Sequence, residues 1–197
     1  MPLSTAGAVG ASTKPLRADA RRNRARVLEV AALALTSDVD VPLEAIAEHA
    51  GVGIGTLYRN FPNRDALIEA VYRNEVELLC AAAPELLGGG RPAVQALREW
   101  MDRFVRYAAT KRGLGSALRA AVGQDAPLFA EVRASILQAL TVLLSAGAED
   151  GSVRADVDAD DVMRAMWAVW LVPDGPEWDG QVRRLLDLVV DGLRFGV

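Results

Sequence analysis

The stretch EHAGVGIGTLYRNF, from Glu48 to Phe61, contains three glycines in five residues, followed by an aromatic and basic run. Glycines gather in this way in a loop that wraps a phosphate group, and also in the turn between two short helices that cross closely. The residues around the glycines distinguish these two structures, and the fold assignment depends on the choice.

A nucleotide-binding loop does not fit this stretch. The glycines at 51, 53 and 55 are spaced G-x-G-x-G, whereas the dinucleotide fingerprint is G-x-G-x-x-G and follows a strand. The preceding segment, 43–50, has a helical pattern instead. A phosphate loop also ends in G-K-[ST], and here Thr56 follows Gly55 with no lysine nearby.

A helix-turn-helix fits on several independent counts. Ala47 is small enough to let two helices cross closely. Gly51, four residues later, can supply the positive φ that a tight turn requires. Leu57, ten residues after Ala47, is placed to pack beneath the first helix. We therefore expect the motif at about 42–61, with a plain helical hairpin as the alternative.

The exposed face of the second helix offers groups that contact DNA. Thr56 can touch a phosphate or a thymine methyl group, and Tyr58 offers a hydroxyl. Arg59 carries a cation for a phosphate or a guanine. Ile54 shares this face, and Gly55 leaves the backbone free to approach a base edge.

The net charge of −4 conceals a basic leading segment. Residues 14–26 carry six basic residues and one acidic residue, a local charge of +5, so residues 27–197 carry −9. A basic segment on an acidic body suits contact with a polyanion, because each neutralised phosphate releases counterions. A solvated basic tail is the alternative. Residues 1–16 have no periodicity and are predicted to be a flexible tail.

The composition predicts an all-α fold. Alanine, leucine and arginine are abundant, β-branched residues are sparse, and no strand-like alternation occurs. Asn63 is a plausible N-cap, and Gly147 and Gly151 are expected to end the helix that precedes them. About nine helices are expected, at 18–36, 43–50, 54–60, 63–87, 92–110, a short piece after 113, 127–146, 161–171 and 177–195.

Few residues suggest catalysis, metal binding or secretion. His49 is the only histidine, too little for a zinc site or a Ser-His-Asp triad. Asp156, Asp158 and Asp160 resemble the start of a calcium loop but lack its later glycine and glutamate, and are expected to be loop and helix-start acids. The single cysteine, Cys80, fits a reducing cytoplasm, and no signal peptide or membrane span is expected. We expect no enzyme, metal or cofactor.

The amino-terminal part, RRNRARVLEVA followed by PLEAIAEHAGVGIGTLYRNFPNRDALIEAVY, resembles the DNA-binding domain of the tetracycline-repressor (TetR) family over roughly residues 20–75. The likeness is carried by Ile46, Ala47, Ala50, Gly51, Val52, Gly55, Thr56, Leu57, Tyr58, Phe61, Arg64, Leu67 and Tyr72. The later segment GSVRADVDADDV, 151–162, resembles the loop before the family's penultimate helix. The end of the first helix departs from the family pattern, and Val41-Pro42 replaces the usual Ser or Thr cap of the second.

The resemblance implies a homodimeric transcriptional regulator whose third helix enters the major groove of a palindromic operator. It implies a DNA-binding domain at 17–78 and a helical ligand-binding and dimerisation domain at 79–197. Arg64 stands where the family usually has a phosphate-contacting lysine. The expected DNA-contacting residues are Gly53, Ile54, Gly55, Thr56, Tyr58, Arg59, Asn60, Arg64 and Arg24.

Two residue sets in the second half are candidates for ligand binding and for dimerisation. The first consists of large side chains that either form ordinary core or line an apolar pocket for an inducer. These are Trp100, Met101, Phe104, Tyr107, Met163 and Trp167. The second lies on two helices, 160–171 and 178–194, that are apolar on most sides and so need partners. Its members are Met166, Trp170, Leu186, Val189, Val190 and Leu193.

The function favoured by these observations is a DNA-binding repressor that an unknown small molecule releases from its operator. An all-helical enzyme acting on a small apolar substrate is one alternative. A non-specific nucleic-acid binder is another, and its affinity would depend on salt but little on sequence.

Overall fold

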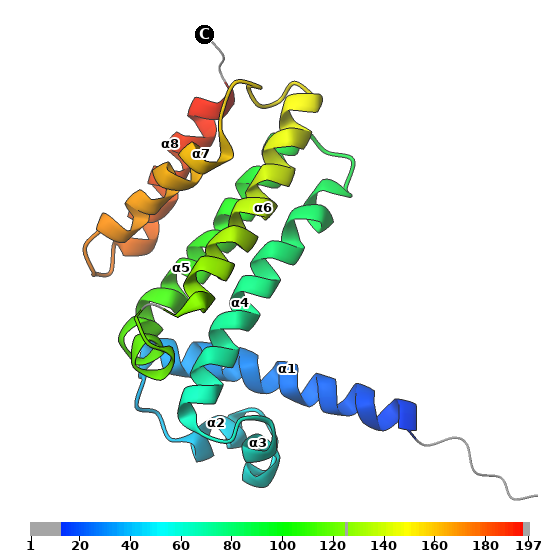
Figure 1. The fold of residues 1–197 in the computed structure, drawn as a ribbon, viewed down its shortest axis with the longest axis vertical. Helices are drawn as coiled ribbons and strands as arrows, with labels where there is room; N and C mark the ends of the chain where they lie inside the picture. Colours follow the sequence, from blue (N-terminus) through cyan, green and yellow to red (C-terminus); the bar gives the residue numbers. More distant parts are fainter. Residues whose placement is uncertain (1–12, 125, 195–197) are drawn as a thin grey trace, which may run out of the picture.

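The computed structural model describes residues 13–124 and 126–194, apart from the side chains of residues 13–18, and its regular structure there is entirely helical. Eight α-helices and one 3₁₀-helix follow one another along the chain (Figure 1). They are α1 (Thr13–Ser37), α2 (Leu43–His49), α3 (Ile54–Asn60), α4 (Arg64–Leu87), α5 (Ala93–Val122), α6 (Pro127–Glu149), α7 (Ala159–Met166), η1 (Trp167–Leu171) and α8 (Trp178–Arg194). The expected all-α class is confirmed.

The amino-terminal helices form a small layer at one end of the molecule. In Figure 1, α1 crosses the base of the long helices, and α2 and α3 lie below it beside the start of α4. Leu35, Ile46, Leu57 and Phe61 are fully buried between these elements. A short helix pair is therefore held against both α1 and α4, because helices of about two turns gain their stability from packing.

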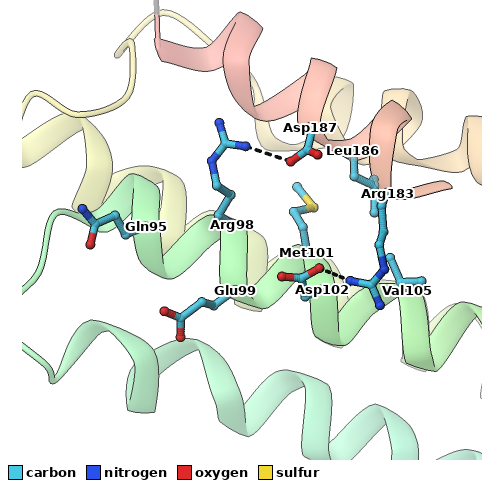
Figure 2. A pocket seen from close by; sticks show the side chains of 9 residues that line it. All are labelled: Gln95, Arg98, Glu99, Met101, Asp102, Val105, Arg183, Leu186 and Asp187. Carbon is cyan, nitrogen blue, oxygen red and sulfur yellow. Dashed lines mark hydrogen bonds and ion pairs between the residues drawn. The ribbon is translucent and has the colours of Figure 1, made fainter. Parts of the chain in front are cut away.

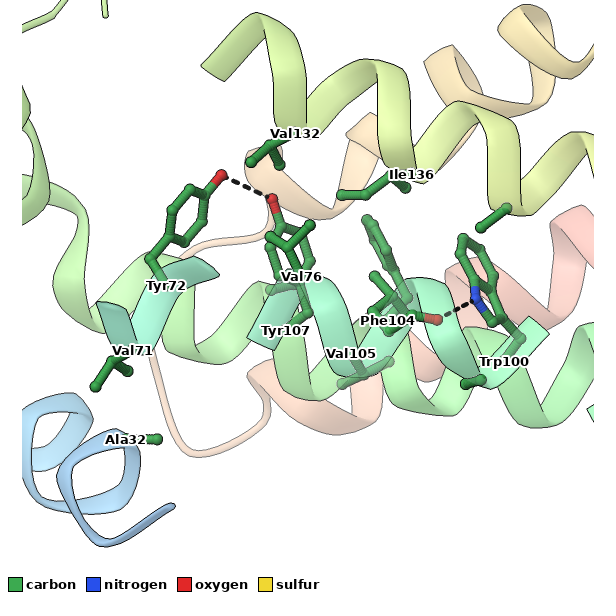
Figure 3. Close-up of a cluster of buried hydrophobic side chains, with 14 of the residues drawn as sticks. Ala32, Val71, Tyr72, Val76, Trp100, Phe104, Val105, Tyr107, Val132 and Ile136 are labelled. Carbon is green, nitrogen blue, oxygen red and sulfur yellow. Dashed lines mark hydrogen bonds between the residues drawn. The ribbon is translucent and has the colours of Figure 1, made fainter. Parts of the chain in front are cut away.

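The body consists of three long helices, α4, α5 and α6, lying side by side, with α7 and α8 packed on them (Figure 1). Large aromatic side chains fill the space between them (Figure 3). The Trp100 indole nitrogen donates a 2.9 Å hydrogen bond to the carbonyl oxygen of Leu79, which satisfies its one polar atom. Of the described helices, α6 alone is long and apolar enough to cross a membrane, and it packs here on α4 and α5.

Helix α1 begins earlier than predicted. The expected tail, 1–16, lies mostly outside the described residues, but α1 already starts at Thr13. Pro15 is the third residue of the helix, where a missing N–H removes no intrahelical hydrogen bond. Proline at this position was therefore compatible with a helix start.

Helix α5 is one continuous helix through Gly113, and the short separate helix predicted after this residue is wrong. The glycine serves a close crossing instead of a helix end. A Cβ atom built at Gly113 would lie 2.9 Å from both Cγ2 and the carbonyl oxygen of Thr36, near the end of α1. Glycine at this position therefore lets the body approach the amino-terminal layer.

We expect Gly113→Ala to destabilise the protein relative to Gly115→Ala by about 1–3 kcal/mol, because the added methyl group meets backbone that cannot move freely. Gly115 is the matched control: its Cβ would meet only the flexible Arg119 side chain, at 3.6 Å. Alanine there should be neutral or stabilising, since helix propensity favours it by about 1 kcal/mol. Urea unfolding of both variants measures the difference, and equal stabilities would contradict the close crossing.

The carboxy-terminal helices differ from the prediction in two details. α6 extends through Gly147 to Glu149; a Cβ at Gly147 would lie 2.5 Å from Val153, so this glycine makes room for the returning loop. Gly151, with φ of 72°, makes the turn after the helix. The helix expected at 161–171 is instead α7 followed by the tighter η1, a common way for a helix to end.

Candidate DNA-binding surface and carboxy-terminal cavity

The turn between α2 and α3 has the geometry of a helix-turn-helix. Gly51 has a φ of 62°, a conformation that favours glycine, and the Val52 amide donates to the Ala47 carbonyl at 3.0 Å. Ala47 is buried where the two helices cross. The predicted roles of Ala47 and Gly51 are confirmed by this geometry.

The other two glycines of the stretch are not required by the backbone. Neither Gly53 nor Gly55 has a positive φ, and a Cβ atom built on either would meet nothing within 4 Å. Both lie exposed at the start of α3. Neither turn geometry nor packing therefore requires glycine at these two positions. Because glycine has no side chain, another molecule can reach the backbone at the start of α3.

The two faces of α3 differ in the way that the sequence predicts. Leu57 is fully buried, whereas Tyr58 is 44% exposed and Ile54 is 38% exposed. Arg59 is exposed and has no hydrogen bond or ion pair within the described part of the chain. Asn60 donates from its side-chain amide to the Thr56 carbonyl at 2.8 Å, and Thr56 is half-buried. The face therefore presents an aromatic hydroxyl and an unpaired guanidinium.

Helix α1 contributes a basic flank beside α3. The Arg24 guanidinium lies over the Phe61 ring, 4.6 Å from its centroid, and is exposed to solvent. Phe61 is the C-cap of α3, so this cation–π contact places a positive charge next to the end of that helix. Arg21, Arg22 and Arg26 are also exposed on the same half of α1, whereas the side chains of Lys14 and Arg17 lie outside the described residues.

Arg64 has a structural role that sequence reasoning did not anticipate. Its two terminal nitrogens donate to the carbonyls of Val39 and Val41, at 2.7 and 2.5 Å. These carbonyls belong to the loop before α2, whose N-cap, Pro42, makes no side-chain capping bond. The guanidinium thus holds the entry to α2 where the Ser or Thr cap is missing. A lysine could not bridge both carbonyls in this fork.

The three aspartates and His49 each have a bonding partner in the structure. Asp158 caps α7 by accepting a 2.7 Å bond from the Asp160 amide, and Asp160 pairs with Arg133. Asp156 pairs with Arg154, whose guanidinium lowers the pKa of that carboxyl. His49 bonds through Nδ1 to the Ala45 carbonyl of its own helix, at 2.7 Å. Each of these side chains therefore has a hydrogen-bond or ion-pair partner within the chain.

A groove between α5 and α8 is lined by paired charges (Figure 2). Arg98 bonds to Asp187 at 2.8 Å, and Arg183 pairs with Asp102. Met101, one of the predicted pocket residues, lies in this groove. These ion pairs join α5 to α8. Because each arginine that lines the groove is already paired with a carboxylate, the groove offers no unpaired cation to a ligand.

A second cavity, of about 340 Å³, lies between α5, the start of α6, α7 and η1. It brings together three of the predicted pocket residues, Tyr107, Met163 and Trp167. The buried Trp100 and Phe104 stack on each other with ring centroids 6.1 Å apart and belong to the core (Figure 3). The predicted pocket is thus divided among a cavity, a groove and the core.

Two tyrosines link the cavity to helix α4. The hydroxyls of Tyr107 and Tyr72 are 3.1 Å apart and buried (Figure 3). Burial raises the pKa of both phenols, so both are neutral and share this hydrogen bond. Tyr72 lies on α4, the helix that begins three residues after α3 and its C-cap. Tyr107, which lines the cavity, therefore bonds directly to α4, the helix that follows the helix-turn-helix.

The structure corrects the residues assigned to the dimer interface. Met166 and Val190 are completely buried inside one chain, and Leu186 and Leu193 are nearly so, so these four are core. Trp170 and Val189 are only half-buried. The most exposed large apolar side chains on these helices are Leu171 and Leu188, 84% and 70% exposed. The two helices are amphipathic: one face packs in the core, and the opposite face is exposed.

The closely crossed helix pair, the exposed basic α3 face and the separate helical body define a helix-turn-helix regulator. The comparisons with known proteins agree: residues 31–71 match the family described as bacterial regulatory proteins, tetR family. Residues 92–195 match the family described as transcriptional regulator SbtR-like, C-terminal domain. The chain belongs to the TetR family of bacterial transcriptional regulators.

Relatives support this assignment along nearly the whole chain. A TetR transcriptional regulator from Streptomyces coelicolor is 44% identical, with a TM-score of 0.81 over 88% of this chain and 99% of its own. A TetR regulatory protein from Mycobacterium vanbaalenii is 38% identical, with a TM-score of 0.74 over 92% of this chain and all of its own. The repressor KstR2 of Rhodococcus jostii is 27% identical over 75% of this chain and 78% of its own.

Proposed function

We propose that this protein is a homodimeric repressor that binds a palindromic operator and leaves it when a small molecule occupies the α5–α6–η1 cavity. The observation that carries the proposal is the α3 surface, where Tyr58 and Arg59 are exposed on a helix whose other face is fully buried. A helix held this way can enter a major groove without rearrangement. The domain division at 17–78 and 79–197, whose boundary falls within α4, stays a prediction.

Repression, rather than activation, is supported by the curated relatives. KstR2 of Rhodococcus jostii and KstR of Mycolicibacterium smegmatis are both HTH-type transcriptional repressors, at 27% and 33% identity. A repressor needs only to occupy its site. Because a repressor acts on chromosomal DNA, we place this protein in the cytoplasm. We propose that it is a regulator and not an enzyme.

Dimerisation is supported by the free face of α8 and η1. Leu188 is largely exposed on α8, next to the half-buried Leu185 and Val189, and the exposed Leu171 ends η1. Exposed leucines on neighbouring helices are typical of a surface that a partner covers. A second copy related by two-fold symmetry would cover both patches and present two α3 helices to successive grooves.

Response to a ligand is supported by the link between Tyr107 and Tyr72. A molecule in the cavity would contact Tyr107, whose hydroxyl bonds to Tyr72 of α4. α4 also packs against α1, which carries the basic flank. A change at the cavity can therefore move the α4–α1 unit, and so the spacing of the two α3 helices in the dimer.

The test is binding to DNA from upstream of the protein's own gene, compared with a scrambled duplex of equal length at two salt concentrations. We expect specific DNA to bind about 10³-fold tighter than scrambled DNA at physiological salt. Equal affinities that fall together as salt rises would instead describe a non-specific basic surface, and would contradict the proposed function.

A further inference from the structure

The carboxy-terminal cavity has an unusual electrostatic character. The 340 Å³ cavity and an adjoining one of about 570 Å³ share five lining residues, so we treat the two as one site. The shared residues are Lys111, Arg119, Phe129, Trp167 and Trp170. Arg112 and Arg133 complete the charged lining. Within 13–124 and 126–194, no Asp or Glu lines either cavity.

Two other grooves of the molecule lack this imbalance. The α5–α8 groove has Arg98 and Arg183 beside Glu99, Asp102 and Asp187. The larger groove between α1, α4 and α5 also mixes charges, and Arg103 there lies 3.6 Å from Glu85. Most arginines of this protein therefore meet a carboxylate, whereas the lining of this cavity has four basic residues, of which only Arg112 and Arg133 pair with a described carboxylate, from outside the lining.

Two of these cations have no anionic partner among the described residues. Lys111 and Arg119 make no ion pair with any described residue. Lys111 is half-buried, with its ammonium 5.1 Å from the Trp170 ring centroid and 5.9 Å from that of Tyr107. Burial, and then the charge of Arg119, lower the pKa of Lys111. A half-buried ammonium that aromatic faces alone accompany is poorly compensated.

Arg112 adds a second, independent observation. Its guanidinium pairs with Asp174 and donates to the Val172 carbonyl at 2.8 Å, yet its Nη1 is buried with no hydrogen-bond partner in the described chain. Buried donors are nearly always satisfied in folded proteins. The described residues therefore leave one donor of a cavity-lining arginine without an acceptor.

The rest of the lining is apolar and aromatic. Trp167, Trp170 and Phe129 face the cavity together with Val132 and Ile136. The Trp167 ring is already covered on one side by the Arg133 guanidinium, 5.7 Å from its centroid, and Arg133 is in turn paired with Asp160. The site thus combines an apolar wall suited to a flat or aliphatic body with two cations, Lys111 and Arg119, that pair with no described residue.

We propose that the effector of this protein is an amphipathic organic anion whose carboxylate or phosphate is bound by Lys111 and Arg119 while its apolar body lies against Trp167 and Trp170. The proposal rests on the function proposed above and names the chemical class of its ligand. Gly115, spaced four residues from each cation along α5, leaves open the face on which they lie.

The first test uses 8-anilinonaphthalene-1-sulfonate, an anion on an aromatic body, with Nile red as a neutral aromatic probe. We expect Lys111→Gln and Arg119→Gln each to weaken binding of the sulfonate about 10-fold, since a charge-assisted hydrogen bond is lost, and to leave Nile red unchanged. Arg103→Gln removes the same charge from the same helix in another groove and should change neither. Unchanged sulfonate binding in both cavity variants would overturn the proposal.

The second test displaces the bound sulfonate with four ten-carbon chains: decanoate, decyl phosphate, decanol and decyltrimethylammonium. We expect at least one anion to compete about 10-fold better than decanol, and the stronger of the two identifies the head group as carboxylate or phosphate. Decanol or the cation competing as well as both anions would overturn the proposal. For the variants of the first test, thermal unfolding shows that each protein is folded.

The two proposals can fail separately. A protein that prefers anions through Lys111 and Arg119 but shows no specific operator binding would contradict the proposed function and leave the ligand class standing. A protein that binds its operator specifically but takes neutral and anionic chains equally would contradict only the ligand class.

Discussion

Arg59→Ala should weaken operator binding by about 30-fold or more while leaving the stability of the protein unchanged. A guanidinium that contacts a base contributes about 1–3 kcal/mol, and a dimer loses two such contacts at once. The fold should not change, because Arg59 is exposed on α3 and makes no hydrogen bond or ion pair within the described residues. Fluorescence anisotropy with labelled operator measures the affinity, and chemical unfolding measures the stability.

The control for this variant is Arg164→Ala, which removes the same charge from the exposed surface of α7. It should change operator affinity by less than about 3-fold, because long-range charge effects are screened at physiological salt. If Arg59→Ala and Arg164→Ala behave alike, α3 does not meet the DNA through the face assigned to it. A uniform loss across specific and scrambled DNA would instead show that Arg59 holds a phosphate.

Leu188→Asp should convert the dimer into a monomer, weakening self-association by more than about 100-fold. Leu188 is 70% exposed in the single chain, so the substitution costs little before association. In a two-fold interface it would bury two carboxylates without partners, and each unpaired buried charge costs about 3–5 kcal/mol. Sedimentation velocity across a concentration series measures the change.

Leu33→Asp is the matched control, because Leu33 is 72% exposed on α1 and lies outside the proposed interface. It should sediment as the unchanged protein does. Leu188→Asp should also lose most of its operator affinity, since a monomer contacts only one half-site. A Leu188→Asp protein that remains a dimer would place the interface elsewhere, on a face other than that of Leu171 and Leu188.

The helix-turn-helix could be predicted from the sequence because its determinants are local. Ala47, Gly51 and Leu57 lie within ten residues of one another, and each has one physical task that few other residue types perform. Gly113 shows the limit of the same reasoning. Glycine is read as a helix end, but the reason for this one is a contact with Thr36, 77 positions earlier in the chain, which no local pattern reveals.

The sites in the body were harder to predict, because an apolar residue looks the same in a core, a cavity and an interface. Met166 and Val190 were expected at the interface but are fully buried, whereas Leu188 on the same helix as Val190 is exposed. Only the position of the helix against its neighbours distinguishes them. The sequence did not predict that Lys111 and Arg119 share a helix face. The helix was expected to end at residue 110, before Gly113, so the two cations were expected on separate segments.

The structural role of Arg64 could not be predicted for a related reason. The family resemblance implied a phosphate contact, yet its partners are backbone carbonyls of residues 39 and 41, which residues of any type could supply. The sequence did contain a signal, since the missing cap before α2 left that loop in need of donors. An arginine whose reach includes such a loop is a candidate for that role.

The most direct test of the central claim is a dimethyl sulfate footprint on the isolated operator, because this reagent methylates guanine N7 in the major groove and adenine N3 in the minor groove. If two α3 helices read the duplex, guanine N7 should be protected in two successive major grooves on one face, centred about 10 base pairs apart or somewhat more. Protection of a single groove, or of adenine N3 with every guanine N7 still reactive, would contradict it.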